Sequence, residues 1–155
     1  MKKILMIGPG RDVRGGISTV VNSYYELGIE KDTEIKYIPT MEDGSQIKKL
    51  IVAVKAYMEF GGCVKKYDIV HVHMAAQASF VRKSLFVQKA KKAGVKVIIH
   101  SHAADFDKYF FEESDDKNRK KIKETFALAD KVIVLSEEWA DFFGKNVCDL
   151  SLIHI

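Results

Sequence analysis

The sequence has little cysteine and little proline, and it has no long hydrophobic run. Its two cysteines, Cys63 and Cys148, are too few for a disulfide framework and lack metal-ligand spacing, so we expect a protein of the reducing cytosol. No stretch approaches the roughly 18 consecutive apolar residues that span a membrane. The start, MKKILMIG, is basic but only briefly apolar, which predicts a first strand and not a secretory signal.

Signatures of covalent catalysis and of nucleic-acid binding are also absent. No G-x-S-x-G motif of a serine hydrolase occurs, and neither cysteine has an obvious histidine partner. The sequence therefore offers no candidate nucleophile. Aromatic residues do not interleave with the basic clusters, as they do in proteins that stack the bases of single strands, so we expect no nucleic-acid partner.

What the sequence does contain is the composition of an ordinary globular protein. Of its 155 residues, 47% are hydrophobic and 30% are charged. A chain of this length buries roughly two thirds of its unfolded surface, which suffices for one domain. We expect that domain to span residues 1–147. The tail, residues 148–155, is expected to be a partial sixth strand or an artificially truncated end, because LSLIHI is similar to translated sequencing-adapter read-through.

Short Val/Ile-rich runs alternate with helical patterns along the chain. The runs lack strict polar alternation, as is typical of strands covered on both faces, and comprise residues 3–7, 34–38, 68–73, 95–100 and 131–135. Helical patterns cover residues 17–27, 47–60 and 79–93, and two further helices begin after the N-caps Ser114 and Ser136. The alternation predicts an α/β fold with a doubly wound, Rossmann-like parallel sheet of order 2-1-3-4-5.

The helices carry further local signals. Glycines are expected to end them, at Gly28, Gly61-Gly62, Gly94 and Gly144. In the second helix, apolar side chains recur at helical spacing and form a stripe that consists of Ile47, Leu50, Ile51, Val54 and Met58.

A glycine-rich loop, GPGRDVRGG from Gly8 to Gly16, follows the first predicted strand. It departs from the dinucleotide motif, because Val13 replaces the third glycine, and from the Walker motif, because Gly16 stands where the lysine belongs. Freed amides at a helix N-terminus still favour an anion. The loop therefore predicts a site for a phosphorylated substrate, with a simple turn as the alternative.

Four histidines form two His-x-His pairs on neighbouring strands, His71 with His73 and His100 with His102. Side chains alternate along a strand, so each pair lies on one face, and the strand ends meet at one crevice. His71 and His100 lie inside buried strands, where a neutral core histidine is commoner than a zinc ligand, so we expect no metal. His102, with a pKa near neutrality, is best placed to exchange hydrogen bonds with a substrate hydroxyl.

Lysines and arginines cluster at residues 48–49, 65–66, 82–83, 89–92 and 117–123. Solvated helix faces are the simplest interpretation. The alternative is attraction to an anionic membrane surface, in which each nearby cation contributes about 1 kcal/mol. Together with the helix over residues 47–60, these clusters suggest peripheral attachment at the inner face of the plasma membrane.

Five segments, taken in order, resemble the N-terminal domain of a GT-B-fold glycosyltransferase. They are residues 3–8, 15–21, 67–73, 99–106 and 129–139, and together they span most of the chain. The resemblance is to the retaining family 4 (group 1) type of bacterial polysaccharide and capsule synthesis. In such enzymes two Rossmann-like domains face each other across a cleft, the N-terminal one binding the acceptor and the C-terminal one the nucleotide-sugar.

The resemblance implies roles for particular residues. Gly15 and Gly16 would approach the donor's diphosphate, and His102, as the catalytic residue, would contact the transferred sugar near the reacting carbon. His73 and Asp105 would line the acceptor side, where a sugar or lipid-linked acceptor binds. Transfer would retain the anomeric configuration by front-face attack, with the nucleotide-sugar as a co-substrate and with no metal or other cofactor.

The C-terminal donor domain is missing from these 155 residues. We therefore expect a hexosyltransferase half that is inactive alone, in the cytoplasm. Two alternatives remain open: a non-catalytic module that complements a separate donor-binding chain, and another GT-B-type enzyme such as a nucleotide-sugar epimerase.

Overall fold

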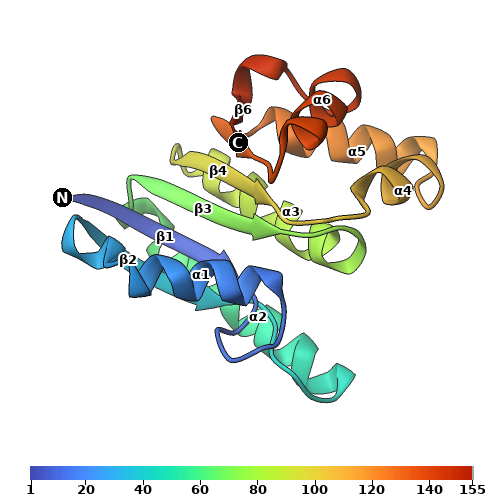
Figure 1. Ribbon diagram of the computed structural model, residues 1–155. Coiled ribbons are helices and arrows are strands. Elements are labelled where there is room, and N and C mark those ends of the chain that lie inside the picture. Colours follow the sequence, from blue (N-terminus) through green and yellow to red (C-terminus); the bar gives the residue numbers. More distant parts are fainter. Residues whose placement is uncertain (155) are drawn as a thin grey trace.

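Six parallel strands form one sheet in the order β2-β1-β3-β4-β5-β6 in the computed structural model, which describes residues 1–154 apart from the side chain of Leu150 (Figure 1). The strands are β1 (Lys2–Gly8), β2 (Thr33–Pro39), β3 (Ile69–Met74), β4 (Lys96–Ser101), β5 (Lys131–Ile133) and β6 (Ile153–His154). The predicted order of the first five strands and the α/β fold class are confirmed. In the tail, Ile153 pairs with Val132 of β5, and Ile155 lies outside the described residues.

Helices connect the strands. The α-helices are α1 (Gly16–Glu26), α2 (Gln46–Cys63), α3 (Gln77–Lys92), α4 (Phe106–Phe111), α5 (Asp116–Ala127) and α6 (Glu137–Asn146), and the 3-10 turns are η1 (Ile29–Lys31), η2 (Val64–Lys66) and η3 (Leu150–Leu152). None of the described helices is both long and apolar enough to cross a bilayer.

Helix boundaries correct several predictions. Ser136 caps α6 by accepting a hydrogen bond from the Trp139 N–H, as predicted. Ser114 does not cap α5, because the neighbouring Asp115 carboxylate accepts from the Asn118 N–H at 2.7 Å instead. Gly28 and Gly94 adopt left-handed conformations just beyond α1 and α3.

The remaining glycine signals are wrong. The pair Gly61-Gly62 lies within α2, and Gly144 lies within α6. An interior glycine costs a helix about 1 kcal/mol relative to alanine, which packing elsewhere along the helix can offset. Cys63 is the last residue of α2.

The two faces of the sheet differ in how they are covered. In Figure 1, α1 lies in front of the sheet while α2 and α3 lie behind it. The hydrophobic core forms on the α2–α3 side, where Phe60, Phe80 and Phe86 meet the inward residues of β1, β3 and β4. On the α1 side, Tyr24 faces histidines of β3 instead of aliphatic residues. The buried histidines of β3 therefore lie on the α1 side of the sheet.

The apolar stripe of α2 does not contribute to this core. Its five side chains are between 49% and 73% exposed, while the helix packs on the sheet through Ala56 and Phe60.

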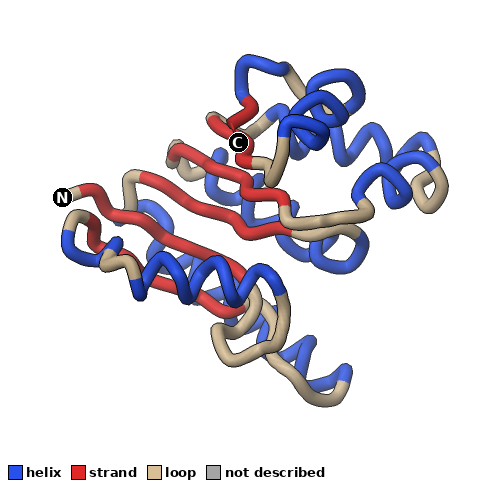
Figure 2. The backbone as a smooth tube through the Cα atoms, viewed as in Figure 1, coloured by secondary structure: helices blue, strands red, loops and turns tan. Residues whose placement is uncertain are grey.

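The carboxyl ends of the strands are where a functional site is expected. Because all strands are parallel, the loops after β1, β3 and β4 leave the sheet at one edge (Figure 2).

Candidate functional site

A pocket of about 320 Å³ opens at the carboxyl edge of β1 and β3. Gly15 and Gly16 line it from the start of α1, Ser79 and Lys83 line it from α3, and His102 lines it from the loop after β4. The structure thus brings together three of the residues that the sequence proposed for the site. Open sheets of this kind bind ligands in the same position, at the edge where strand order reverses.

The glycines lie where a ligand can approach the backbone. Gly15 has a φ of 156°, which L-residues rarely adopt, and its carbonyl accepts the Thr19 N–H at 3.1 Å in the first turn of α1. A Cβ at either Gly15 or Gly16 would meet no atom within 4 Å, so both face open space. Ser18 ties the loop down by donating to the Gly10 carbonyl at 3.0 Å. The start of α1 is therefore free to bind an anion through its unpaired amides.

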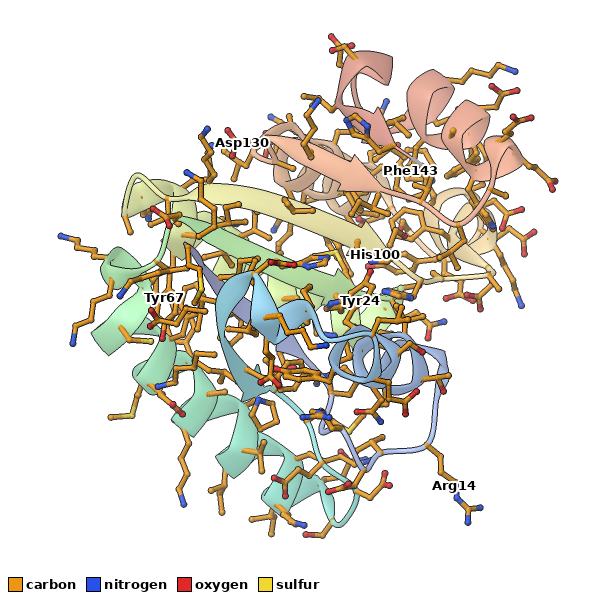
Figure 3. All side chains as sticks on the ribbon, turned by 60° about the vertical axis from the view of Figure 1, so that its left-hand side comes forward. Arg14, Tyr24, Tyr67, His100, Asp130 and Phe143 are labelled. Carbon is orange, nitrogen blue, oxygen red and sulfur yellow. The ribbon has the colours of Figure 1, made fainter. Side chains whose placement is uncertain are left out.

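His102 is held by bonds from both backbone and side chain. Its N–H donates to the Met74 carbonyl at 2.8 Å, which joins the ends of β3 and β4. Its Nε2 lies 2.9 Å from Nδ1 of His73. The rings of His100 and His102 stack with centroids 4.0 Å apart, and the Tyr24 hydroxyl of α1 lies 3.5 Å from Nδ1 of His100 (Figure 3). The His102 ring is thus held in place by the Met74 backbone and by the rings of His73 and His100.

All four histidines are neutral at physiological pH. Burial, with the His100 ring as a second cause, lowers the pKa of His71 to about 3. Burial lowers the pKa of His100 to about 4. Burial also lowers the pKa of His102 to about 3, with the neighbouring His100 and Lys83 as further causes. Burial and the neighbouring rings lower the pKa of His73 further still. His102 is therefore a neutral imidazole, and its pKa lies below the near-neutral value expected from the sequence.

Because both rings are neutral, either His73 or His102 donates the hydrogen bond that joins them. We assign the proton to Nδ1 of His73, which then donates to Nε2 of His102. In this tautomer the buried and unpartnered Nε2 of His73 is an acceptor, whereas the opposite choice would bury an unpaired N–H. His102 then carries its proton on Nδ1.

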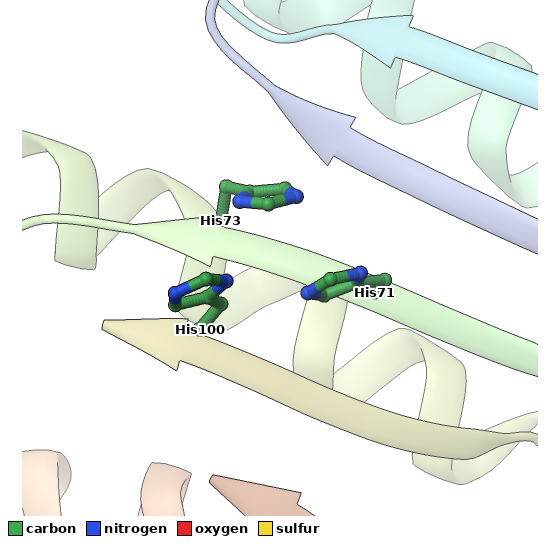
Figure 4. Close-up of side chains that lie close together, drawn as sticks. All are labelled: His71, His73 and His100. Carbon is green, nitrogen blue, oxygen red and sulfur yellow. The ribbon is translucent and has the colours of Figure 1, made fainter. Parts of the chain in front are cut away.

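His71, His73 and His100 are the described residues that could hold a metal ion on this face (Figure 4). Their ligand atoms lie within 4.8 Å of one another. Zinc bonds of about 2.0–2.1 Å would bring tetrahedral ligand atoms to about 3.3 Å apart, so the rings would have to close in. The rings of His71 and His100 are nearly parallel, with centroids 5.8 Å apart and planes 5° from parallel, and the buried Nε2 atoms of His71 and His73 have no hydrogen-bond partner among the described residues.

Two proposed acceptor-side residues lie apart from the pocket surface. His73 has no exposed surface and lies beneath His102. Asp105 is exposed and precedes α4, but its side chain makes no capping bond and does not line the pocket.

Three polar residues that α3 contributes to the pocket were not assigned to the site from the sequence. Arg82 and Lys83 were grouped with the surface clusters, yet Lys83 is only 2% exposed and lines the pocket together with Ser79. Their spacing on the first turns of the helix after β3 was the available signal, since positions i, i+3 and i+4 share a helix face.

Comparisons with known proteins show which family the chain matches. A 2-deoxyribosyltransferase from the psychrotolerant bacterium Bacillus psychrosaccharolyticus is similar over 90% of this chain and 89% of its own, with 14% identity and a TM-score of 0.45. A search of curated protein sequences finds no match. The family model of Glycosyltransferase Family 4 matches residues 24–154. That match covers most of the chain, and the chain belongs to glycosyltransferase family 4.

Proposed function

We propose that this chain is the acceptor-binding domain of a retaining glycosyltransferase, which transfers a hexose from a nucleotide-sugar to a polysaccharide or lipid-linked acceptor. One observation supports this most: Gly15 and Gly16, at the start of α1, line the same pocket as His102. The amides would bind the donor's diphosphate. His102 would bind a hydroxyl of the transferred sugar through its Nδ1–H, and His73 would orient that ring.

The proposed reaction needs no protein nucleophile. The side chains that line the pocket include no carboxylate and no thiol. An acceptor hydroxyl would attack the anomeric carbon from the face that the diphosphate leaves, and its proton would pass to the departing phosphate oxygen. Configuration is then retained. Asp105, exposed at the start of α4, would contribute to the acceptor side, and no metal or other cofactor would be required.

A donor-binding domain would have to be supplied to complete the cleft. The residues that the structure describes form a single six-stranded sheet. Preorganised positive charge at a developing phosphate is often the largest catalytic contribution. We therefore propose that the chain alone has no useful transferase activity.

Fusion to the donor domain of a family 4 enzyme of known donor tests this function. We expect nucleotide release in the fusion and none from the isolated chain. His102→Ala should lower the rate by roughly 100-fold, as loss of one preorganised hydrogen bond does elsewhere. His154→Ala, a change at the exposed end of β6, is the matched control, and chelation with EDTA should change nothing. Full activity of His102→Ala would refute the assignment.

We also propose that α2 attaches the domain to an anionic membrane. Its exposed stripe borders a groove of about 460 Å³ that also includes Lys49, Arg82 and the half-exposed Leu85 of α3. Exposed apolar patches beside cations are typical of membrane-surface sites.

Sedimentation with vesicles tests the membrane proposal. We expect binding to vesicles that contain anionic lipid and little binding to neutral ones. The double variant Leu50→Asn with Met58→Asn should bind at least tenfold more weakly, because each side chain contributes roughly 1.5–3 kcal/mol on burial. Leu27→Asn, at a leucine that is 85% exposed outside this groove, should bind normally. Equal binding to neutral and anionic vesicles would remove the electrostatic part.

A further inference from the structure

Lys83 is a buried cation without a counter-charge. Its side chain is 2% exposed, and its Nζ donates to the Ser79 hydroxyl at 3.1 Å. None of the ion pairs among the described residues includes Lys83 or Arg82. A buried ammonium that lacks an acidic partner is costly, so such groups are rare unless something else neutralises them.

The surroundings of Lys83 add further positive charge. The pocket is lined by three cationic side chains, Arg14, Arg82 and Lys83, and by no carboxylate. The buried Nε of Arg82 has no hydrogen-bond partner. Burial, and then the charge of Arg82, lowers the pKa of Lys83 to about 7. An entering anion would stabilise the charged lysine, since an opposite charge nearby favours ionisation.

Ser79 is arranged to complete an anion site. Its Oγ accepts from the Ala75 N–H and from Lys83, both at 3.1 Å. With both lone pairs engaged, the hydroxyl proton remains free to donate into the pocket. Ser79 also lies in the first turn of α3, where the helix dipole favours negative charge.

We propose that Ser79, Arg82 and Lys83 form a phosphate-binding subsite opposite Gly15 and Gly16. It rests on the proposed function only in that the phosphate belongs to a substrate of this enzyme. Two substrates would offer the same phosphate chemistry to this subsite: the donor, through its diphosphate, and a phosphorylated acceptor. In either case the three side chains would hold the group against the start of α1, beside His102.

Calorimetric binding of inorganic phosphate and pyrophosphate to the isolated domain tests the subsite. Binding should be measurable for the wild type and at least tenfold weaker for Lys83→Met. Lys92→Met removes the same charge from the exposed end of α3 and should bind normally. Lys83→Met should also be at least as resistant to heat as the wild type, because it removes an uncompensated buried charge. Ser79→Ala, a smaller change, should weaken binding as well.

The outcomes separate this inference from the proposed function. Equal binding by Lys83→Met, or no phosphate binding by the wild type, overturns the subsite, whatever the fusion enzyme does. If phosphate binding depends on Lys83 but the fusion releases no nucleotide, the transferase assignment is refuted and the subsite is still supported. Competition identifies the source: stronger displacement by nucleoside diphosphates indicates the donor, and stronger displacement by glycerol 3-phosphate indicates a phosphorylated acceptor.

Discussion

Acidification from about pH 7.5 to about pH 5.5 should lower the free energy of unfolding by roughly 4–5 kcal/mol. Burial keeps the pKa of each of four histidines below its usual value of 6.5 in the folded state: His71, His73, His100 and His102. In the unfolded chain they return to about 6.5. A loss of this size approaches the whole stability of a typical domain.

The sign follows from proton uptake. Below pH 6.5 the histidines of the unfolded chain bind protons, whereas those of the folded chain do not. The stability that is present above pH 6.5 is therefore lost as the pH falls toward the folded-state pKa values, about 3 for His71 and about 4 for His100. Each histidine contributes about 1.4 kcal/mol at pH 5.5. The total is taken below four times that value because the His102 side chain is not fully buried.

Urea denaturation at several pH values, in buffer with EDTA, measures this effect. His71→Leu removes one of the four groups, so the slope of unfolding free energy against pH should fall by about one quarter below pH 6. A stability that stays flat between pH 7.5 and 5.5 would show that these rings are not buried as described.

Phe106→Ala should destabilise the domain by about 3–5 kcal/mol. Phe106 is the first residue of α4, has no exposed surface, and packs against Phe126 and Phe143 with ring centroids 5.7 and 4.9 Å away. Truncation leaves a cavity among rings that cannot collapse into it.

Phe111→Ala is the matched control on the same short helix, since Phe111 is 56% exposed. It should cost less than about 1 kcal/mol. Midpoints of urea unfolding with unchanged slopes give both values. Similar losses for the two variants would mean that α4 is not anchored by its first residue. Because α4 follows the His102 loop directly, Phe106→Ala should also weaken substrate binding.

The sheet could be predicted because its signals are strong and local. Val/Ile-rich runs and intervening amphipathic segments gave five strands in the correct order, within two residues at each boundary. Helix α4 was missed because six residues are too few to show a helical period. The cap at Asp115 was misplaced by one residue because serine and aspartate are equally good caps.

Tertiary packing decides features that the sequence pattern leaves open or misses. The stripe of α2 has helical spacing, but spacing alone does not show which face meets the sheet, and here Ala56 and Phe60 do. Lys83 was interpreted as a surface residue because lysine is almost never buried. The histidine pairs were placed correctly on one face, whereas the low pKa of His102 depends on neighbours that come together only in the fold.

Strand pairing is shortest at the β6 edge of the sheet. β1 and β2 share seven paired positions and β3 and β4 share six, but β5 and β6 share two. Backbone amides in β1 and β3 are therefore expected to exchange with deuterium only when the whole domain unfolds, while those of β6 exchange through local opening. The pocket lined by Gly15, Gly16 and His102 thus lies beside the strands that are expected to exchange slowly.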